Sequence, residues 1–422
     1  YAGDPLKAGG LYVWRVQVWD DDVSRISAPA HFGVEIDGLA GDWIQKPTHT
    51  TYQSPVGRAK GEETEAYAVY LRRELSLAET PVRAVAYVCG LGAYQLSLNG
   101  RTVNDSLLDP GQTDYARFAL YQAYDVTDYI ESITVVGVVL GNGRYIRAYD
   151  YDFPKLMFEL RVFYEDGRVD TFASGEGWAA SHGPIRENGI FFGERYDARE
   201  VLDGWNRPGY DQSAWEQAVV VDGPEVRPGH VQPIRVTDRL APTRMYRTAD
   251  NTYVYDFGQN MSGIVRLRVR GPEGVEVTVR HAELVYEDGR LNRTTNRSAA
   301  ASVTYVCAGS GWEEYQPQFT YHGFRYAEIA GYPGVPNLDT LEALFVHTDV
   351  PRIGSFACSD ELLNRVHKNI VWGQLSNFMS IPTDCPQRDE RMGWLGDAQL
   401  TAEEACLNFD MSLFYGKYLD DI

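Results

Sequence analysis

Residues 384–397 read Asp-Cys-Pro-Gln-Arg-Asp-Glu-Arg-Met-Gly-Trp-Leu-Gly-Asp, and they stand where the sequence changes from a strand pattern to a helix pattern. The stretch holds four carboxylates, two guanidinium groups and one tryptophan. Pro382, Pro386 and Gly393 break helical hydrogen bonding, which predicts a loop. Apolar residues stand between the charges, and a freely solvated loop would not favour them. The stretch is therefore predicted to be a partly buried, charged loop.

This composition suits a site that cleaves sugars. In most glycoside hydrolases two carboxyl groups flank the glycosidic bond, one as proton donor and one as base or nucleophile. Arginines hold carboxylates and sugar hydroxyls through forked hydrogen bonds, and a tryptophan offers an apolar plane. A second interpretation stays open, in which the charges form a salt-bridged surface and Asp397 is only the N-cap of a helix over residues 398–409.

The stretch resembles the signature at the entrance to the catalytic domain of the bacterial α-L-rhamnosidases, glycoside hydrolase family 78. Residues 85–145, which include Asp-Pro-Gly-Gln-Thr at 109–113, resemble the N-terminal β-domain of that family. Residues 255–330, which include Tyr-His-Gly-Phe-Arg at 321–325, resemble its next β-domain. The resemblance therefore covers nearly the whole chain.

Strand signals fill the chain up to about residue 350. Residues 11–20 alternate with period two, and residues 31–36 form a second candidate strand. Further strands are predicted over 66–77, 84–89, 93–98, 133–140, 155–164, 263–270, 275–282, 301–307 and 324–329. Asn99-Gly100 is a strong signal for a tight turn. Many short strands separated by turns indicate β-sandwiches or jelly rolls.

After Pro351 the spacing of apolar residues becomes helical. Ser359 is predicted to cap a helix that runs to about residue 379. A second helix is predicted from Ala398 and a third from near Ser412. The resemblance implies a catalytic barrel of twelve helices, which needs upwards of roughly 180 residues. Only about 70 residues follow Pro351, so the barrel is expected to be truncated.

The predicted fold is multidomain and mainly β, with β-sandwich and jelly-roll domains followed by the first helices of a truncated (α/α)6 barrel. Residues 1–38 are predicted to be part of a fibronectin-like β-sandwich, and residues 39–236 a jelly-roll-like, carbohydrate-binding-like β-domain. Residues 237–350 are predicted to form a second β-sandwich domain. Residues 351–422 are predicted to begin the (α/α)6 catalytic domain. The chain starts without methionine, so we expect the true N-terminus to be missing.

The resemblance implies an inverting hydrolysis that releases terminal α-L-rhamnose from rhamnose-containing glycosides or oligosaccharides. Glu390 matches the general acid of the family. Asp384 and Asp397 match carboxylates that hold sugar hydroxyls. Arg388 and Trp394 match substrate-binding positions, with Trp394 against the methyl-bearing face of the deoxy sugar.

The general base of the family is a glutamate further along the barrel, and no residue here matches it. We therefore expect residues 1–422 alone to lack useful activity, and the last 70 residues to be poorly ordered or abnormally packed without a partner piece. The pKa of Glu390 must lie near the working pH if it is to donate and recover a proton. Neighbouring carboxylates raise that pKa, while Arg388 and Arg391 lower it, and the sequence leaves the balance open.

Composition limits the partners. The formal net charge is −20 over 422 residues, which argues against nucleic acid and anionic membrane surfaces. No stretch of eighteen apolar residues predicts a transmembrane helix. The five cysteines are scattered without a C-x-x-C pair, so neither zinc nor a redox motif is supported, and we predict a cytoplasmic location. No cofactor is expected, although an accessory calcium ion is possible by analogy, with no residues assigned. The oligomeric state stays open.

Lesser motifs have simpler interpretations. His281, His322, His347 and His367 are each predicted to be structural rather than metal ligands, and no metal site is expected. The glycine-rich residues 140–143 are predicted to be a turn, since a phosphate loop needs a following helix. The sequons at Asn292 and Asn296 are taken as incidental. Two other functions stay open: a non-catalytic carbohydrate-binding multidomain protein, and a helical-barrel hydrolase acting on another sugar.

Overall fold

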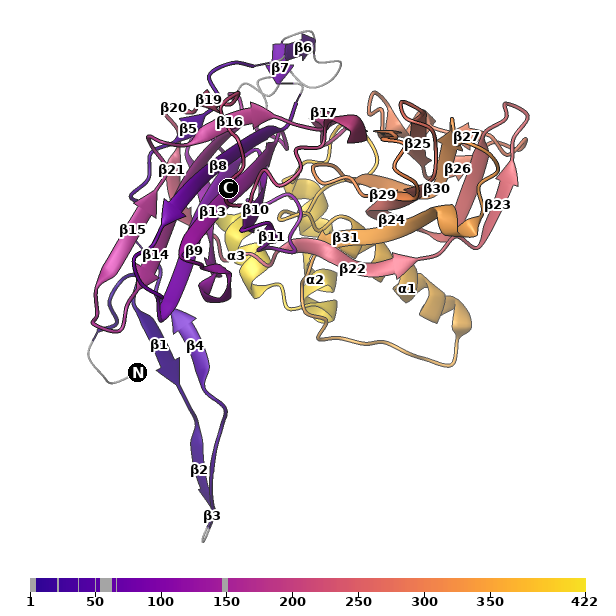
Figure 1. Ribbon diagram of the computed structural model, residues 1–422. Helices are drawn as coiled ribbons and strands as arrows, with labels where there is room; N and C mark the ends of the chain where they lie inside the picture. The colour runs from indigo at the N-terminus through magenta and orange to yellow at the C-terminus, as the bar shows by residue number, and fades with distance from the viewer. Residues whose placement is uncertain are drawn as a thin grey trace.

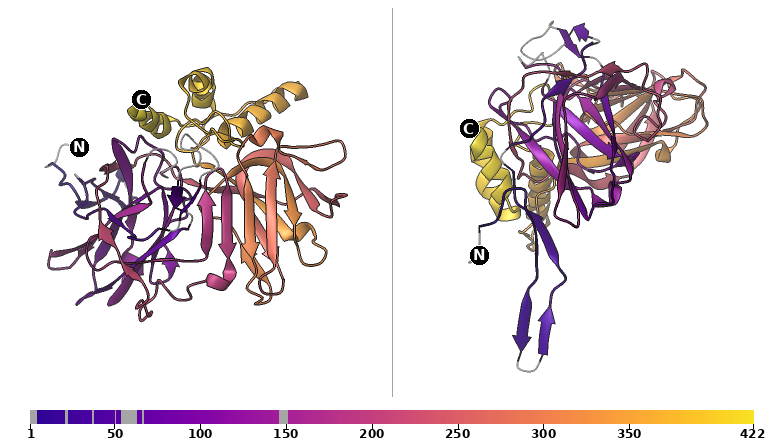
Figure 2. Two further views of the ribbon diagram at one scale, coloured as in Figure 1. Left: turned by 90° about the horizontal axis from the view of Figure 1, so that it is seen from above. Right: turned by 60° about the vertical axis from the view of Figure 1, so that its left-hand side comes forward.

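Two β-bodies stand side by side, and three helices lie together along one side of them (Figures 1 and 2). The computed structural model describes residues 5–20, 23–36, 38–49, 51–53, 63–65, 67–145 and 151–422. The chain builds the first body, then the second, and ends in the helices. This order agrees with the predicted fold, a mainly β chain followed by the start of a helical domain.

The first body is a sandwich of a six-stranded and a seven-stranded sheet, in the orders β11-β10-β13-β8-β16-β19 and β20-β5-β14-β9-β12-β21 with β15 beside β14. Its long strands are β8 (Val69–Ser76), β9 (Arg83–Leu91), β10 (Ala93–Leu98), β12 (Phe118–Asp125), β13 (Ile133–Gly141) and β14 (Lys155–Phe163). The short ones are β5 (Ile44–Gln45), β11 (Arg101–Thr102), β15 (Val169–Ala173), β16 (Ala179–His182), β19 (Glu216–Gln217), β20 (Val219–Val220) and β21 (Glu225–Pro228). Apolar side chains of both sheets, among them Leu71, Val88, Val138 and Leu160, share one buried core.

The predicted strands of this body are confirmed to within a few residues, apart from residue 66, which lies outside the described residues. Residues 93–98 match β10 at both ends because the alternation of apolar side chains stops at Asn99-Gly100. Asn99 and Gly100 have φ angles of 50° and 79°, the left-handed conformation that a tight hairpin turn needs. The predicted turn between β10 and β11 is therefore confirmed.

The second body is one continuous ten-stranded sheet in the order β17-β18-β28-β25-β30-β24-β31-β22, with β23 and β29 both paired to β24. Its main strands are β22 (Ile234–Leu240), β24 (Tyr253–Val269), β25 (Glu276–Ala282), β28 (Ser302–Val306), β30 (His322–Ala330) and β31 (Leu341–Thr348). Shorter ones are β17 (Ile185–Gly189), β18 (Gly193–Asp197), β23 (Arg244–Arg247) and β29 (Glu313–Tyr315), beside a separate pair, β26 (Leu284–Val285) and β27 (Leu291–Asn292). A register shift between Asp256 and Met261 lets the long β24 change partners along its length.

The two bodies are interwoven, because β17 and β18 belong to the stretch 39–236 and yet lie in the second sheet. Gly193 opens the parallel pairing of β18 with β28, and a Cβ there would overlap the Ser302 carbonyl oxygen. The next residue, Glu194, is buried, and its carboxylate accepts hydrogen bonds from Tyr315 Oη (2.6 Å) and from the backbone N–H of Phe319 (3.1 Å) and Gln318 (3.1 Å). Burial raises the pKa of this carboxyl despite those donors.

The N-terminal segment differs from its expectation. The single strand expected over 11–20 is divided into β1 (Leu11–Trp14) and β2 (Gln17–Asp20), which pair with β4 (Ala30–Gly33) and β3 (Val23–Ile26) in a ribbon that projects from the first body (Figure 1). The described residues of 1–38 form a two-stranded ribbon on which Trp14 and Trp19 are exposed. That they are part of a fibronectin-like sandwich stays a prediction.

Helices α1 (Glu361–Ser376), α2 (Leu395–Asn408) and α3 (Ser412–Asp421) follow. Asp360 rather than the expected Ser359 caps α1, because its side chain accepts from Leu362 N–H. The start of α2 lies three residues before the expected Ala398, and α3 begins as predicted. Packing of Phe378, Ala405, Phe409 and Phe414 forms a small core between the helices, while many leucines of α1 and α2 stay exposed. No described helix has the length and apolarity needed to cross a membrane.

Replacing Glu194 is expected to destabilise the protein, because Glu194→Ala leaves a buried hydroxyl and two buried backbone N–H groups without acceptors. The free energy of unfolding should fall by about 3 kcal/mol, measured by denaturant titration. Glu187→Ala, which truncates an exposed glutamate on the adjacent β17, is the control and should change it by less than about 0.5 kcal/mol. Equal effects of the two variants would contradict this assignment.

Candidate active site

The charged loop predicted at 384–397 lies between α1 and α2, and residues 378–394 contain no helix. Pro386 and Gln387 lie against Gly323 in the second body, where an added Cβ would come within 2.8 Å of them. The loop therefore runs across the β-bodies rather than into solvent. The interpretation of Asp397 as an N-cap is wrong, because Trp394 occupies that position and Asp397 lies in the first turn of α2.

Arg391 fixes the loop to the second body. Its side chain is completely buried, and its guanidinium donates to the carbonyl oxygens of Ile190 (2.8 Å), Tyr321 (2.6 Å) and Arg388 (2.9 Å). The rings of Tyr321 and Phe191 flank it, with centroids 4.6 and 5.2 Å from Cζ. From the sequence, Arg391 was expected only to act as a charge near Glu390, and its burial was not predicted.

Arg144 fixes the same loop to the first body. It follows the glycine-rich residues 140–143, of which Leu140 and Gly141 end β13, and the predicted turn lies one step later, at Gly143 and Arg144. Its guanidinium donates to the carbonyl oxygen of Glu390 (3.0 Å), to that of Arg391, and to Met392 Sδ (3.3 Å). The loop is thereby held from both bodies within three consecutive residues.

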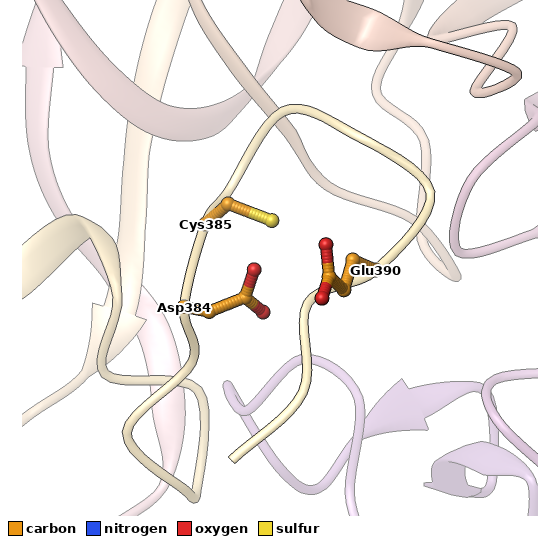
Figure 3. Close-up of side chains that lie close together, drawn as sticks. All are labelled: Asp384, Cys385 and Glu390. Carbon is orange, nitrogen blue, oxygen red and sulfur yellow. The ribbon is translucent and has the colours of Figure 1, made fainter. Parts of the chain in front are cut away.

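The structure brings four of the five predicted site residues together. Arg388 bridges two carboxylates, with Nη2 2.7 Å from Asp384 Oδ2 and Nε 2.9 Å from Glu390 Oε2. Trp394 Nε1 donates to the other oxygen of Glu390, Oε1, at 2.9 Å. Met392 N–H donates to Asp384 Oδ1 at 2.8 Å. Figure 3 shows Asp384 and Glu390 on facing segments of the loop.

Asp397, the fifth, is exposed on α2 and apart from this network. It lines a cavity of about 350 Å³ between α1 and α2, and Asp384 lines the same cavity. Polar residues of the cavity wall include Gln374, Asn377 and Thr383. Carboxylates and amides around a space of this size offer hydrogen-bond partners to the hydroxyls of a sugar.

The guanidinium groups decide the protonation of Glu390. Hydrogen bonds from Arg388, then Trp394, and a further one from Arg297 hold the pKa of this carboxyl below its usual value. The sequence left open whether neighbouring carboxylates or arginines control the pKa of Glu390. In the structure the hydrogen-bond donors prevail, and they favour the ionised carboxylate in the free site. Burial raises the pKa of the nearby Cys385 thiol to about 11, so the thiol is protonated.

Asp384, Cys385 and Glu390 have ligand atoms within 4.8 Å of one another, the arrangement drawn in Figure 3. Arg388 already supplies a positive charge to both carboxylates, so an ion pair network accounts for the cluster. The histidines lie elsewhere. His281 and His322 stack in the second body with centroids 4.5 Å apart, while His347 and His367 hydrogen-bond Thr237 and Asn408.

Arg297 and Ser298 were missed as site residues. Arg297 Nη1 lies 2.9 Å from Glu390 Oε2, and Ser298 Oγ donates to Asp389 Oδ2. In the sequence, this segment stood out only as a sequon at Asn296. Asn296 is buried, and its side-chain N–H donates to the His281 carbonyl oxygen at 2.9 Å, so it is not accessible to modification.

Arg391→Ala is expected to lower the free energy of unfolding by about 3 kcal/mol, because it leaves buried carbonyl oxygens unpaired and a cavity between two rings. Arg391→Lys should recover only part of this loss, since an ammonium group lacks the planar fork. Denaturant titration measures both. Arg365→Ala on α1, where the side chain is exposed, is the control, and a loss of the same size there would contradict the assignment.

Three domain descriptions match the chain in succession. The α-L-rhamnosidase N-terminal domain matches residues 79–238, and the bacterial α-L-rhamnosidase concanavalin-like domain matches residues 246–347. The bacterial α-L-rhamnosidase 6 hairpin glycosidase domain matches residues 351–422. The last of these contains the whole candidate loop.

Curated relatives agree. An α-L-rhamnosidase of Formosa agariphila is 36% identical over 457 residues, which cover 100% of this chain and 48% of the relative. One of Streptomyces avermitilis is 40% identical over 364 residues, which cover 83% of this chain and 35% of the relative. The chain therefore spans about half the length, or less, of the curated relatives it matches.

Solved structures give the same result. The α-L-rhamnosidase from Dictyoglumus thermophilum superposes with a TM-score of 0.94 at 48% identity, covering 100% of this chain and 49% of that one. The Streptomyces avermitilis α-L-rhamnosidase complexed with L-rhamnose superposes with a TM-score of 0.87 at 28% identity, covering 99% of this chain and 57% of that one. With three successive domain matches and relatives that align over its full length, this chain belongs to the bacterial α-L-rhamnosidase family.

Proposed function

We propose that this chain supplies the proton-donor part of an inverting glycoside hydrolase site that releases terminal α-L-rhamnose from rhamnose-containing glycosides. The observation that carries the proposal is the anchoring of Glu390. Its backbone carbonyl accepts from Arg144, and its two carboxylate oxygens accept from Arg388 and Trp394. A carboxyl group held in one orientation can deliver a proton to a glycosidic oxygen at a fixed place.

Asp384 is unsuited to be the general base. In an inverting site the two carboxyl groups stand roughly 6.5–9.5 Å apart, so that a water molecule fits between them. The nearest oxygens of Asp384 and Glu390 lie within 4.8 Å and share Arg388. Both oxygens of Asp384 are already bonded, to Arg388 and to the Met392 N–H. We therefore do not assign Asp384 as the base, and we propose, as the family resemblance implies, that the base is a glutamate further along the barrel.

Sugar recognition is assigned to the remaining residues. The side chain of Trp394 belongs to a residue that is 51% exposed, so its ring can receive the apolar, methyl-bearing face of a 6-deoxy sugar. Asp384 and Asp397 line one cavity, and we propose that they hold sugar hydroxyls there, Asp397 through its exposed carboxylate and Asp384 beside its bonds to Arg388 and Met392. Support for rhamnose comes from the Streptomyces avermitilis relative, whose structure was solved with L-rhamnose.

Two lesser assignments remain proposals. All five cysteines are unpaired, which supports a reducing, cytoplasmic location. Acid–base hydrolysis requires no cofactor, and an accessory calcium ion has no assigned residues.

Glu390→Gln in the full-length protein should lower kcat on an alkyl α-L-rhamnoside by about 100-fold or more, because glutamine keeps the shape of the side chain and cannot donate the proton. Kinetic assays measure this, with Glu403→Gln on the exposed face of α2 as the matched control. Rhamnose binding, measured by calorimetry, should survive in Glu390→Gln. Full activity of Glu390→Gln would refute the assignment of Glu390 as the general acid. Turnover of a different glycoside would favour a hydrolase of another sugar, and binding without any turnover would favour a carbohydrate-binding protein.

Residues 1–422 expressed alone should show no measurable turnover, because Asp384 lies too close to Glu390 to act as an inverting base and the family resemblance implies a base further along the barrel. The measurement is hydrolysis of nitrophenyl α-L-rhamnoside, with the full-length protein at equal concentration as reference. Wild-type turnover by residues 1–422 would overturn the assignment of the base to a later part of the domain.

A further inference from the structure

A turn of the second body reaches the proton donor directly. Arg297 Nη1 lies 2.9 Å from Glu390 Oε2, and Ser298 Oγ hydrogen-bonds the neighbouring Asp389 carboxylate. Both residues come from the connection between β27 and β28, far from the loop in sequence. Two consecutive residues of a β-body therefore hold two consecutive carboxylates of the catalytic loop.

This turn is itself rigidly held. Asn296 is buried, with its side-chain N–H bonded to the His281 carbonyl oxygen at 2.9 Å, and its own carbonyl accepts from Ala299 N–H at 3.0 Å. Arg297 follows with a φ of 52°, a backbone conformation that non-glycine residues rarely adopt. The turn holds Arg297 in this conformation while its guanidinium contacts Glu390.

The contact has little value for folding. The Arg297 side chain is 57% exposed, and ion pairs as exposed as this one contribute little to stability. Its effect falls on the carboxylate instead. Oε2 of Glu390 accepts from two guanidinium groups, those of Arg297 and Arg388, whereas Oε1 accepts from the neutral indole N–H of Trp394.

We propose that Arg297 is a positioning residue for the proton donor, which holds Oε2 of Glu390 and so leaves Oε1 as the oxygen that carries and delivers the proton. A proton on Oε2 would face two positive charges, while a proton on Oε1 would face none at hydrogen-bond distance. This inference rests on the proposed function of Glu390 as the general acid.

The pH dependence follows from the charges around Glu390. The charged and titratable groups that face it are Arg297, Arg388, Asp384, Cys385, Asp389 and, at its backbone carbonyl, Arg144. Arg297 is one of the donors that hold the pKa of Glu390 below its usual value. Removing its charge raises that pKa, so the acid keeps its proton to higher pH. The alkaline limb of kcat/KM, which reports the acid of the free enzyme, should then move upward.

The test compares the full-length wild type with Arg297→Gln and Arg297→Lys on two substrates across pH. An alkyl α-L-rhamnoside needs a proton on its leaving oxygen, while a nitrophenyl α-L-rhamnoside depends on that proton much less.

The kcat of Arg297→Gln should fall about tenfold on the alkyl substrate and clearly less on the nitrophenyl substrate. The alkaline limb of its kcat/KM profile should move up by about half a pH unit. Arg297→Lys keeps a positive charge at this position, so the alkaline limb of its kcat/KM profile should stay near that of the wild type. Arg290→Gln, which removes an arginine paired with Asp288 in the same body, is the matched control and should change neither quantity.

Equal losses on both substrates with an unmoved alkaline limb would overturn the inference, and so would the same changes in Arg290→Gln. Melting temperatures of all variants are measured alongside, and the exposed position of Arg297 predicts values close to that of the wild type. If Arg297→Gln shows none of the predicted changes while Glu390→Gln has lost its activity, the inference about Arg297 is wrong and the proposed function of Glu390 stands. A wild type inactive on both rhamnosides would overturn the proposed function and this inference together.

Discussion

The position of the loop of residues 384–397 depends on one buried guanidinium. Burying a charge costs several kcal/mol unless its N–H groups find acceptors. The Arg391 guanidinium donates to carbonyl oxygens of Ile190 and Tyr321 in the second body and of Gln387 and Arg388 in its own loop. The loop can therefore lie only where those carbonyls are. Once Arg391 is fixed, Glu390 on one side and Met392 on the other are fixed with it.

The β-bodies also balance the charge of the loop. Residues 384–397 carry four carboxylates and two guanidinium groups, an excess of two negative charges. Arg144 of the first body and Arg297 of the second body supply two further guanidinium groups at the acid, one on its backbone and one on its carboxylate. Opposite charges at this distance stabilise the ionised carboxylates. The two β-bodies thus supply positive charge to Glu390, the proposed acid, which lies in residues 351–422.

Local signals in the sequence were sufficient to predict most of the strands and helices. Strand alternation that ends at Asn99-Gly100 located β10, and the prolines and glycines around 382–393 located the loop. Asp384, Arg388, Glu390 and Trp394 could be predicted together because they lie within eleven residues of one loop and match a family signature.

Features that depend on distant partners could not be predicted in this way. Arg144 precedes Glu390 by 246 residues, and Arg297 precedes it by 93. Nothing in the local pattern of β17 and β18 indicates that they join the second sheet, since period-two alternation reports a buried face and not a neighbouring strand. The same limit explains residues 11–36. Their alternation predicted strands correctly, but it carried no information on whether a second sheet covers them.

We infer that contacts with the two β-bodies hold the loop of residues 384–397, which contains the proposed acid Glu390, in place. Amide hydrogen exchange of residues 1–422 measures this most directly, because it reports how often each amide of the loop opens. The account predicts that the N–H groups of Thr383, Asp384 and Met392, bonded to Asn377 O, Met392 O and Asp384 Oδ1, exchange as slowly as those of β24. Rapid exchange at these three amides while β24 stays protected would contradict it.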